Sequence, residues 1–200
     1  MNFPDSSAVE HLRETRLSSE RVFDGHFVRV NRDVVRLPDG KQTIREYFIH
    51  PGAVMMIPLL DDGQVVLERQ WRYPLARAFI EFPAGKIDHG ESPIATAIRE
   101  LREETGYVAA KLSYLCTINN AISYSNEHID FYLAQELSLG QAKLDDGEFL
   151  DVFTVPAQQV VDWVRDGTIT DVKTIIGAFW LEKIVKGEWH PEKGADGTIR

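Results

Sequence analysis

The sequence predicts an α/β protein, with a mixed sheet and helices on both of its sides. Three observations favour this class. Short strand-like runs bounded by turn residues fill much of the chain, one well-capped helix is expected at 93–105, and two amphipathic helices are expected at about 157–166 and 172–185. The length of 200 residues suits one large domain, or one domain with an accessory element.

The first fifty residues combine a polar segment with strands. Residues 1–20 are polar and charged, and we expect them to be partly disordered or to form a short helix. The turn Pro38-Asp39-Gly40 predicts a hairpin, because proline and glycine fit its backbone angles. Strands are expected here at 27–30, 34–37 and 44–49.

The strands of the next hundred residues are also bounded by turn signals. Asp61-Asp62-Gly63 predicts a second hairpin, between strands at 53–58 and 64–68. Later strands are expected at 79–82, 112–119, 128–134 and 150–155. The chain has no internal repeat and no low-complexity segment, which excludes a repeat architecture.

The helix expected at 93–105 carries start and stop signals. Ser92 suits the N-cap, Pro93 the first helical position and Gly106 the end. Apolar residues on one face should anchor the helix to a core. These residues are Ile94, Ala97, Ile98 and Leu101.

The same helix gathers three glutamates, Glu100, Glu103 and Glu104, at helical spacing. Neighbouring like charges destabilise a helix, so the cluster favours a hard divalent cation such as Mg²⁺ that neutralises it. The alternative is a solvated acidic face. We rank it second, because solvated helices gain from alternating charges and these carboxylates are grouped beside a glycine-rich turn.

Composition excludes some partners. The formal net charge is −9 and no run is rich in lysine or arginine, so we expect no nucleic-acid polymer, although a small nucleotide remains compatible. The chain lacks a signal region and an apolar run that could span a bilayer, so we expect no membrane partner. Cys116 is the only cysteine, which predicts a buried structural thiol in a reducing cytoplasm.

Residues 85–107 resemble the signature of the Nudix hydrolases. Eight positions fall in register: Gly85, Glu91, Arg99, Glu100, Leu101, Glu103, Glu104 and Gly106. Tyr107 departs from the pattern, which more often has an aliphatic residue there. The resemblance implies a Nudix α/β/α sandwich with a mixed sheet over residues 51–200. It also implies that residues 1–50, a tail and an antiparallel β-strand subdomain, form a homodimer as in ADP-ribose pyrophosphatase-type members.

The resemblance also assigns a metal set. Glu100 and Glu104 would bind Mg²⁺ directly, Mn²⁺ can substitute, and the backbone carbonyl of Ala84 would add a ligand. Glu103 is assigned both to the metal cluster and to the catalytic set.

Substrate-binding residues are expected in segments similar to the ADP-ribose and nucleoside-diphosphate-sugar branch. Arginine presents a planar fork of donors to phosphate oxygens, so Arg72 first, and Arg69 second, would bind the diphosphate. A surface arginine packing on an aromatic side chain is the alternative. Glu81 orients Arg72 or the loop, or is purely structural. Glu127, placed with the substrate-binding set, would support a metal or a loop.

The resemblance to this branch implies that the catalytic base comes from an acidic loop after the signature helix, a place that residues 145–149 occupy here. Hydrolysis needs a carboxylate that takes a proton from water. Glu148 is the first choice and Asp146 the second, with a solvated acidic turn as the alternative.

Together these features predict Mg²⁺-dependent hydrolysis of a nucleoside diphosphate sugar, a small molecule resembling ADP-ribose, to a nucleoside monophosphate and a sugar phosphate. Ile122 stands where ADP-ribose-specific members usually have proline, which gives weight to other sugar nucleotides. The alternatives are a Nudix hydrolase of a dinucleotide or nucleoside triphosphate, and a sensor that binds a nucleotide sugar without cleaving it. A purely structural oligomer is a further alternative.

Overall fold

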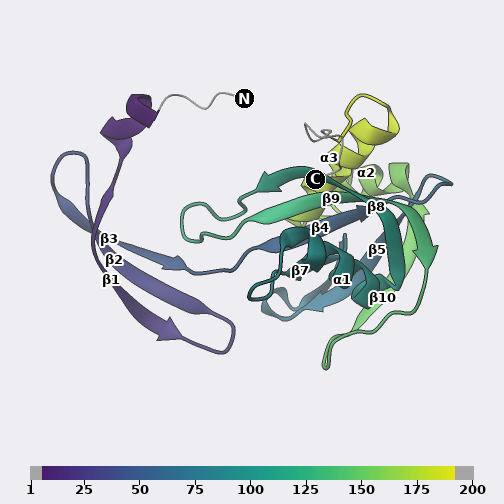
Figure 1. Cartoon of the computed structure of the whole chain (residues 1–200), viewed down its shortest axis with the longest axis horizontal. Coiled ribbons are helices and arrows are strands. Elements are labelled where there is room, and N and C mark those ends of the chain that lie inside the picture. Colours follow the sequence, from purple (N-terminus) through teal and green to yellow (C-terminus); the bar gives the residue numbers. More distant parts are fainter. Residues whose placement is uncertain (1–5, 192–200) are drawn as a thin grey trace. The chain divides into compact units, whose positions relative to one another are not determined.

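The computed structural model describes residues 6–191 (Figure 1). The chain forms two compact units. The first joins the residues up to His50 with Ala121–Glu127, and the second contains Pro51–Asn120 and the residues from His128 onward. The predicted disorder or helix of residues 1–20 lies outside the described residues at positions 1–5.

The first unit is built on a three-stranded antiparallel sheet in the order β1-β2-β3. A 3₁₀ helix precedes it, and the elements are η1 (Ser6–Leu12), β1 (Thr15–Asp24), β2 (Arg29–Arg36) and β3 (Gln42–Phe48). The predicted hairpin at Pro38-Asp39-Gly40 is confirmed, since it joins β2 to β3.

The short helix expected within residues 1–20 is present as η1, but two other predictions for the first unit were wrong. β1 is a strand that begins within the segment expected to be disordered or helical. Its apolar residues, Leu17, Val22 and Phe23, do not alternate with polar ones, so the sequence shows no strand pattern here. β2 is continuous where two short strands, 27–30 and 34–37, were expected. Its polar middle, Asn31-Arg32-Asp33, pairs with both neighbouring strands, and this pairing keeps the strand extended.

The second unit contains a four-stranded sheet in the order β7-β4-β9-β8 and a three-stranded sheet in the order β10-β5-β6. β4 pairs with β9 in parallel and every other pair in these sheets is antiparallel, so the four-stranded sheet is mixed, as predicted. The strands are β4 (Ala53–Pro58), β5 (Gln64–Arg72), β6 (Arg77–Glu81), β7 (Ala84–Lys86), β8 (Tyr107–Ile118), β9 (Ile129–Leu139) and β10 (Leu150–Pro156). The short 3₁₀ helix η2 (Tyr73–Leu75) follows β5.

The hairpin predicted at Asp61-Asp62-Gly63 forms only a turn. β4 and β5 belong to different sheets, and a single bridge between Leu59 and Val65 joins them. Each strand already has two partners, because β4 lies between β7 and β9 while β5 lies between β10 and β6.

Three helices complete the second unit, α1 (Pro93–Thr105), α2 (Ala157–Arg165) and α3 (Val172–Val185). α1 begins and ends as predicted: the hydroxyl of Ser92 accepts a hydrogen bond from the Ala95 N–H, and Gly106 has a φ of 77°. No helix among residues 6–191 is long and apolar enough to cross a membrane.

Alternate residues of β4 face two apolar cores. Met55 and Ile57 belong to a core shared with α2 and α3, and Val54 and Met56 to a core shared with α1. Helices therefore cover both faces of the sheet, which gives the predicted three-layer sandwich.

The apolar face predicted for α1 is only partly right. Ala97 and Leu101 are buried, but Ile94 is 37% exposed and Ile98 50% exposed. The buried stripe instead continues one turn on to Glu104, which is 4% exposed. A carboxylate of the acidic cluster therefore lies on the buried side of this helix.

Candidate active site

The acidic cluster of α1 packs against β7. The Glu104 carboxylate accepts a hydrogen bond of 3.1 Å from the backbone N–H of Ala84. The Glu100 carboxyl lies so close to Gly85 that a Cβ built there would fall 2.0 Å from the Glu100 Cδ. Only glycine leaves room for that carboxyl, which gives the first glycine of the signature a physical reason.

Arg99 makes most of the ion pairs of this cluster, and Arg102 lies 3.8 Å from Glu103. Arg99 donates to Glu91 at 3.1 and 2.9 Å and to Glu103 at 3.1 Å, and it forms an ion pair with Glu100 at 2.8 Å. Hydrogen bonding to Glu91 is the largest cause that raises the pKa of Arg99. Four carboxylates thus share one guanidinium, since Asp88 also lies 3.8 Å from it, and no ion pair among residues 6–191 joins Arg99 to Glu104.

Burial disfavours the charged form of the carboxylates in this cluster, and the nearby cations do not compensate. It is the largest cause that raises the pKa of Glu104 well above its ordinary value, and the charges of Glu68, Glu100 and Glu148 add to the effect. Burial also raises the pKa of Glu100. Clustered, destabilised carboxylates are the donor set that a hard divalent cation stabilises.

No group of three or more His, Cys, Asp or Glu side chains among residues 6–191 converges closely enough to enclose a metal ion. Glu100 and Glu103 are turned to Arg99, and Glu104 accepts from Ala84. The oxygen chemistry and the charge deficit fit a cation, and binding one requires these carboxylates to reorient.

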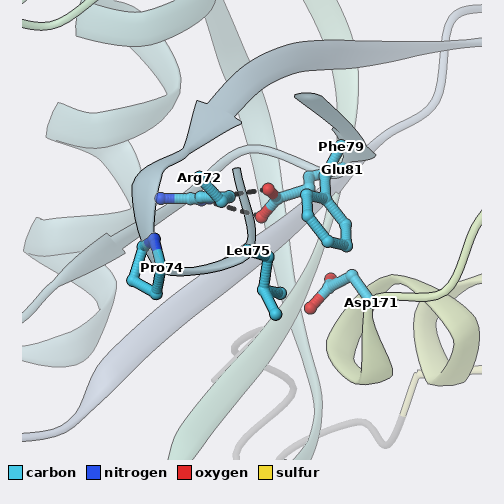
Figure 2. Close-up of a pocket in the computed structure, with 6 residues that line it drawn as sticks. All are labelled: Arg72, Pro74, Leu75, Phe79, Glu81 and Asp171. Atoms are coloured by element: carbon cyan, nitrogen blue, oxygen red, sulfur yellow. Dashed lines mark hydrogen bonds and ion pairs between the residues drawn. The ribbon is translucent and has the colours of Figure 1, made fainter. Parts of the chain in front are cut away.

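Arg72 is fixed by a second charged cluster (Figure 2). Its Nε and Nη2 donate to the two oxygens of Glu81, each at 2.7 Å. Lys173 of α3 donates to the same carboxylate and, at 2.9 Å, to Asp171. Burial alone would raise the pKa of Glu81, but hydrogen bonds from Arg72 and Lys173 leave it lowered.

A cavity of about 270 Å³ opens beside this ion pair. Figure 2 shows the residues that line it: Arg72, Pro74, Leu75, Phe79, Glu81 and Asp171. Arg72 uses two of its five N–H donors to bind Glu81, so its other donors can bind an anion. The arrangement supports the reading in which Glu81 orients Arg72.

The two candidate bases lie in the loop between β9 and β10. Gln70 donates a hydrogen bond of 3.1 Å to Glu148, and the charge of Glu148 contributes to the raised pKa of Glu104 after that of Glu68 and Glu100. Asp146 lies exposed in the turn of the same loop.

Two of the predicted substrate-binding residues contact residues outside these clusters. Arg69 follows the alternation of β5 to the face opposite Gln70 and Arg72, and it binds Asp151 at 3.0 and 2.5 Å. Glu127 belongs to the first unit, where its carboxylate lies 3.9 Å from Nδ1 of His50. Ile122 also belongs to that unit and is 81% exposed.

Sequence reasoning missed three residues around the site, Glu68, Gln70 and Lys173. Glu68 ends the buried run of β5, and its carboxylate oxygens have no hydrogen-bond partner within residues 6–191. A charged residue at the end of the apolar run 65–67 was a signal that could have been noticed. Lys173 gave no such signal, since it stands 92 positions from the Glu81 it contacts.

Comparison with known proteins gives consistent matches. A model of the NUDIX domain matches residues 49–175, and a model of the nucleoside diphosphate sugar hydrolase N-terminal domain matches residues 14–48. A crystal structure of an ADP compounds hydrolase has a TM-score of 0.79 at 26% identity and covers 88% of this chain and 97% of its own. These matches confirm the predicted resemblance and fold class.

Several relatives align over most of their length. The ADP-ribose pyrophosphatase of Bacillus subtilis (strain 168) is 36% identical over 176 residues, which is 87% of this chain and 95% of that protein. The methanol dehydrogenase activator of Bacillus methanolicus is 35% identical, over 86% and 94%. The ADP-sugar pyrophosphatase of Mus musculus is 31% identical, over 78% of each chain.

Proposed function

The chain belongs to the NUDIX family, and from that premise we propose that it hydrolyses the diphosphate bond of a nucleoside diphosphate sugar resembling ADP-ribose. The products are a nucleoside monophosphate and a sugar phosphate. One observation carries the proposal: a buried, charge-deficient carboxylate cluster and a guanidinium held by Glu81 occur in the same unit. The match to a nucleoside diphosphate sugar hydrolase N-terminal domain and the names of the relatives support the substrate class.

The α1 cluster would hold the cation. Glu100 and Glu104, with the carbonyl of Ala84, are the proposed ligands of Mg²⁺, and Mn²⁺ can substitute. When bound, the cation supplies the positive charge that neutralises the diphosphate. Arg99 holds Glu91, Glu100 and Glu103 in position.

Arg72 would bind the diphosphate through the donors that Glu81 leaves free. A guanidinium fixed on one edge loses little side-chain freedom when phosphate binds its other edge. The buried ion pairs of Glu81 therefore serve binding by holding Arg72 in place.

Glu148 would take the proton of the attacking water, with Asp146 as the second candidate. Gln70 donates to one oxygen of Glu148 and so limits the orientations of its carboxylate. The loop position suits a base that must approach a bound substrate.

We further propose that the chain forms a homodimer through its first unit, as its similarity to the nucleoside diphosphate sugar hydrolase N-terminal domain suggests. The net charge of −9 argues against a nucleic-acid polymer as partner. The single cysteine supports a place in a reducing cytoplasm.

A phosphatase-coupled phosphate-release assay tests the proposal. The panel contains ADP-ribose, other nucleotide sugars, dinucleotides and nucleoside triphosphates, each with Mg²⁺ and with EDTA. Metal-dependent cleavage of a nucleotide sugar is the expected result, and the preferred sugar shows what Ile122 means for selectivity. Faster cleavage of a dinucleotide or triphosphate would replace the substrate class. No cleavage by a folded chain that Mg²⁺ stabilises would favour the sensor.

A further inference from the structure

Glu68 is the most anomalous charged residue of the second unit. Its side chain is 0% exposed, and neither carboxylate oxygen has a hydrogen-bond partner in the part of the chain that the structure describes. Burial is the largest cause that raises its pKa, to about 8. Buried polar groups are nearly always paired, so an unpaired carboxyl at this depth requires an explanation.

The neighbouring cations of the protein do not supply that partner. Lys173 attracts Glu68 electrostatically but donates to Glu81 and Asp171 instead. Arg72 also attracts it, yet its guanidinium forms a two-bond pair with Glu81. Both cations are therefore paired with carboxylates other than Glu68.

Strand pairing links Glu68 to the segment that contacts the acidic cluster: Glu68 pairs with Glu81 between β5 and β6, and Ala84, three positions after Glu81, donates its N–H to Glu104. After burial, the charge of Glu68 is the leading cause of the raised pKa of Glu104. Strand alternation puts Glu68 on the same face of β5 as Gln70, whose amide reaches Glu148. Glu68 therefore adds a carboxylate to the face of β5 that also carries Gln70 and Arg72.

We propose that Glu68 is a further carboxylate ligand of the divalent cation held by Glu100 and Glu104, an inference that rests on the proposed function. A cation would give Glu68 the partner that the described protein lacks, and it would relieve the repulsion between Glu68 and Glu104. Glu68 lies outside the residues 85–107 that carry the signature. It would extend the metal set from α1 and β7 to β5.

A competing explanation is that Glu68 simply keeps its proton and stays neutral, with no part in cation binding. The two explanations differ in one quantity, the affinity of the protein for a divalent cation. A neutral, structural Glu68 contributes nothing to that affinity, whereas a ligand contributes directly.

The test is a titration with Mn²⁺, followed by electron paramagnetic resonance of the free ion. The variants are Glu68→Gln, of nearly equal shape, and Glu68→Met, which removes every oxygen. Asp33→Asn is the matched control, because Asp33 is also buried with one unpartnered carboxylate oxygen but belongs to the first unit. We expect a Mn²⁺ dissociation constant at least about tenfold larger for both Glu68 variants, and one within about twofold of wild type for the control.

Thermal melting gives a second readout. Without cation, the Glu68 variants should melt at or above the wild-type temperature, because they lose a buried unpaired carboxyl. With Mn²⁺, the rise in melting temperature should be smaller for them than for wild type. A purely structural role for Glu68 would leave that cation-dependent rise unchanged.

Mn²⁺ affinity within about twofold of wild type in a folded Glu68 variant overturns the inference, and it leaves the proposed function intact if wild type still cleaves nucleotide sugars. A wild-type chain that binds no Mn²⁺ and cleaves nothing overturns both. If neither variant folds, anomalous scattering from Mn²⁺-soaked wild-type crystals decides. An ion within about 2.6 Å of a Glu68 oxygen supports the inference, and an ion bound elsewhere overturns it.

Discussion

Glu104 and Glu81 are buried to nearly the same depth, at 4% and 2% exposed, yet their pKa values move in opposite directions. Glu104 accepts one backbone hydrogen bond and faces other carboxylates. Glu81 accepts from Arg72 and Lys173. Burial is the largest cause at both residues, so the difference lies in their partners.

The comparison separates two uses of buried charge. Around Glu81 the protein supplies its own cations, Arg72 and Lys173, and their pairing with Glu81 fixes the side chain of Arg72. Around Glu104 it supplies too few, and the deficit is what an external cation would fill. A buried carboxylate therefore indicates a ligand site only when too few protein cations surround it to balance its charge.

Among changes in the charge-deficient cluster around Glu104, Glu104→Gln should have the largest effect on turnover. We expect turnover to fall by about 100-fold or more, a loss typical of a removed electrostatic group in an active site. The metal-free melting temperature should hold or rise, because the substitution removes repulsion between carboxylates. Phosphate release and thermal melting measure both, and near-normal turnover in a folded protein would rule out Glu104 as a metal ligand.

Among changes in the charge-balanced cluster around Glu81, Lys173→Met should have the largest effect on the free energy of unfolding. It leaves Glu81 and Asp171 without a shared cation, and breaking a buried pair in this way costs about 3 kcal/mol of unfolding free energy. Urea unfolding measures the loss. Lys183→Met is the control, because Lys183 lies on the same helix but pairs with Glu188 at a more exposed position. Equal losses in the two variants would contradict the importance of the Glu81 cluster.

The metal-free protein should become less stable as pH rises from about 4.5 to 8. The pKa of Glu68 is about 8 in the folded chain and near 4.5 when unfolded, so in this window the folded state holds a proton that the unfolded state has lost. Stability present below pH 4.5 is then lost with rising pH, by up to about 1.4 kcal/mol per pH unit. Glu104 adds a slope of the same sign.

Urea unfolding in EDTA at several pH values measures this slope. Glu68→Gln cannot titrate there, so its slope should be shallower than that of wild type. Parallel slopes for the two proteins would contradict the raised pKa of Glu68.

Arg69→Ala should give the smallest effect. Arg69 binds Asp151 on an exposed face, so we expect KM for a nucleotide sugar to change less than about twofold, as for a surface ion pair. Arg72→Ala, measured beside it, should raise KM far more. A large effect of Arg69→Ala would restore Arg69 to the diphosphate site.

Local signals were predictable and distant partners were not. The limits of α1 followed from Ser92, Pro93 and Gly106, because capping depends on residues adjacent in the chain. The clustering of its glutamates followed from helical spacing. The roles of Glu148, Asp146 and Glu127 remain predictions.

The features that escaped prediction depend on contacts between distant residues. β1 is exposed along its length and is a strand because it pairs with β2. The parallel pairing of β4 with β9 joins residues 76 positions apart at Ala53 and Ile129. The balance around Glu81 depends on Lys173, whose distance in sequence hides their contact.

The bridge between Phe48 and Ser125 can form only after the ribosome has synthesised Ser125. Ser125 follows Phe48 by 77 residues, and at about 5–20 residues per second a ribosome needs roughly 4–15 s to make them. During that interval the emerging β3 has its partner β2 but not the segment 121–127 that completes the first unit. A shortened chain ending at residue 50 would remain in that unfinished state permanently.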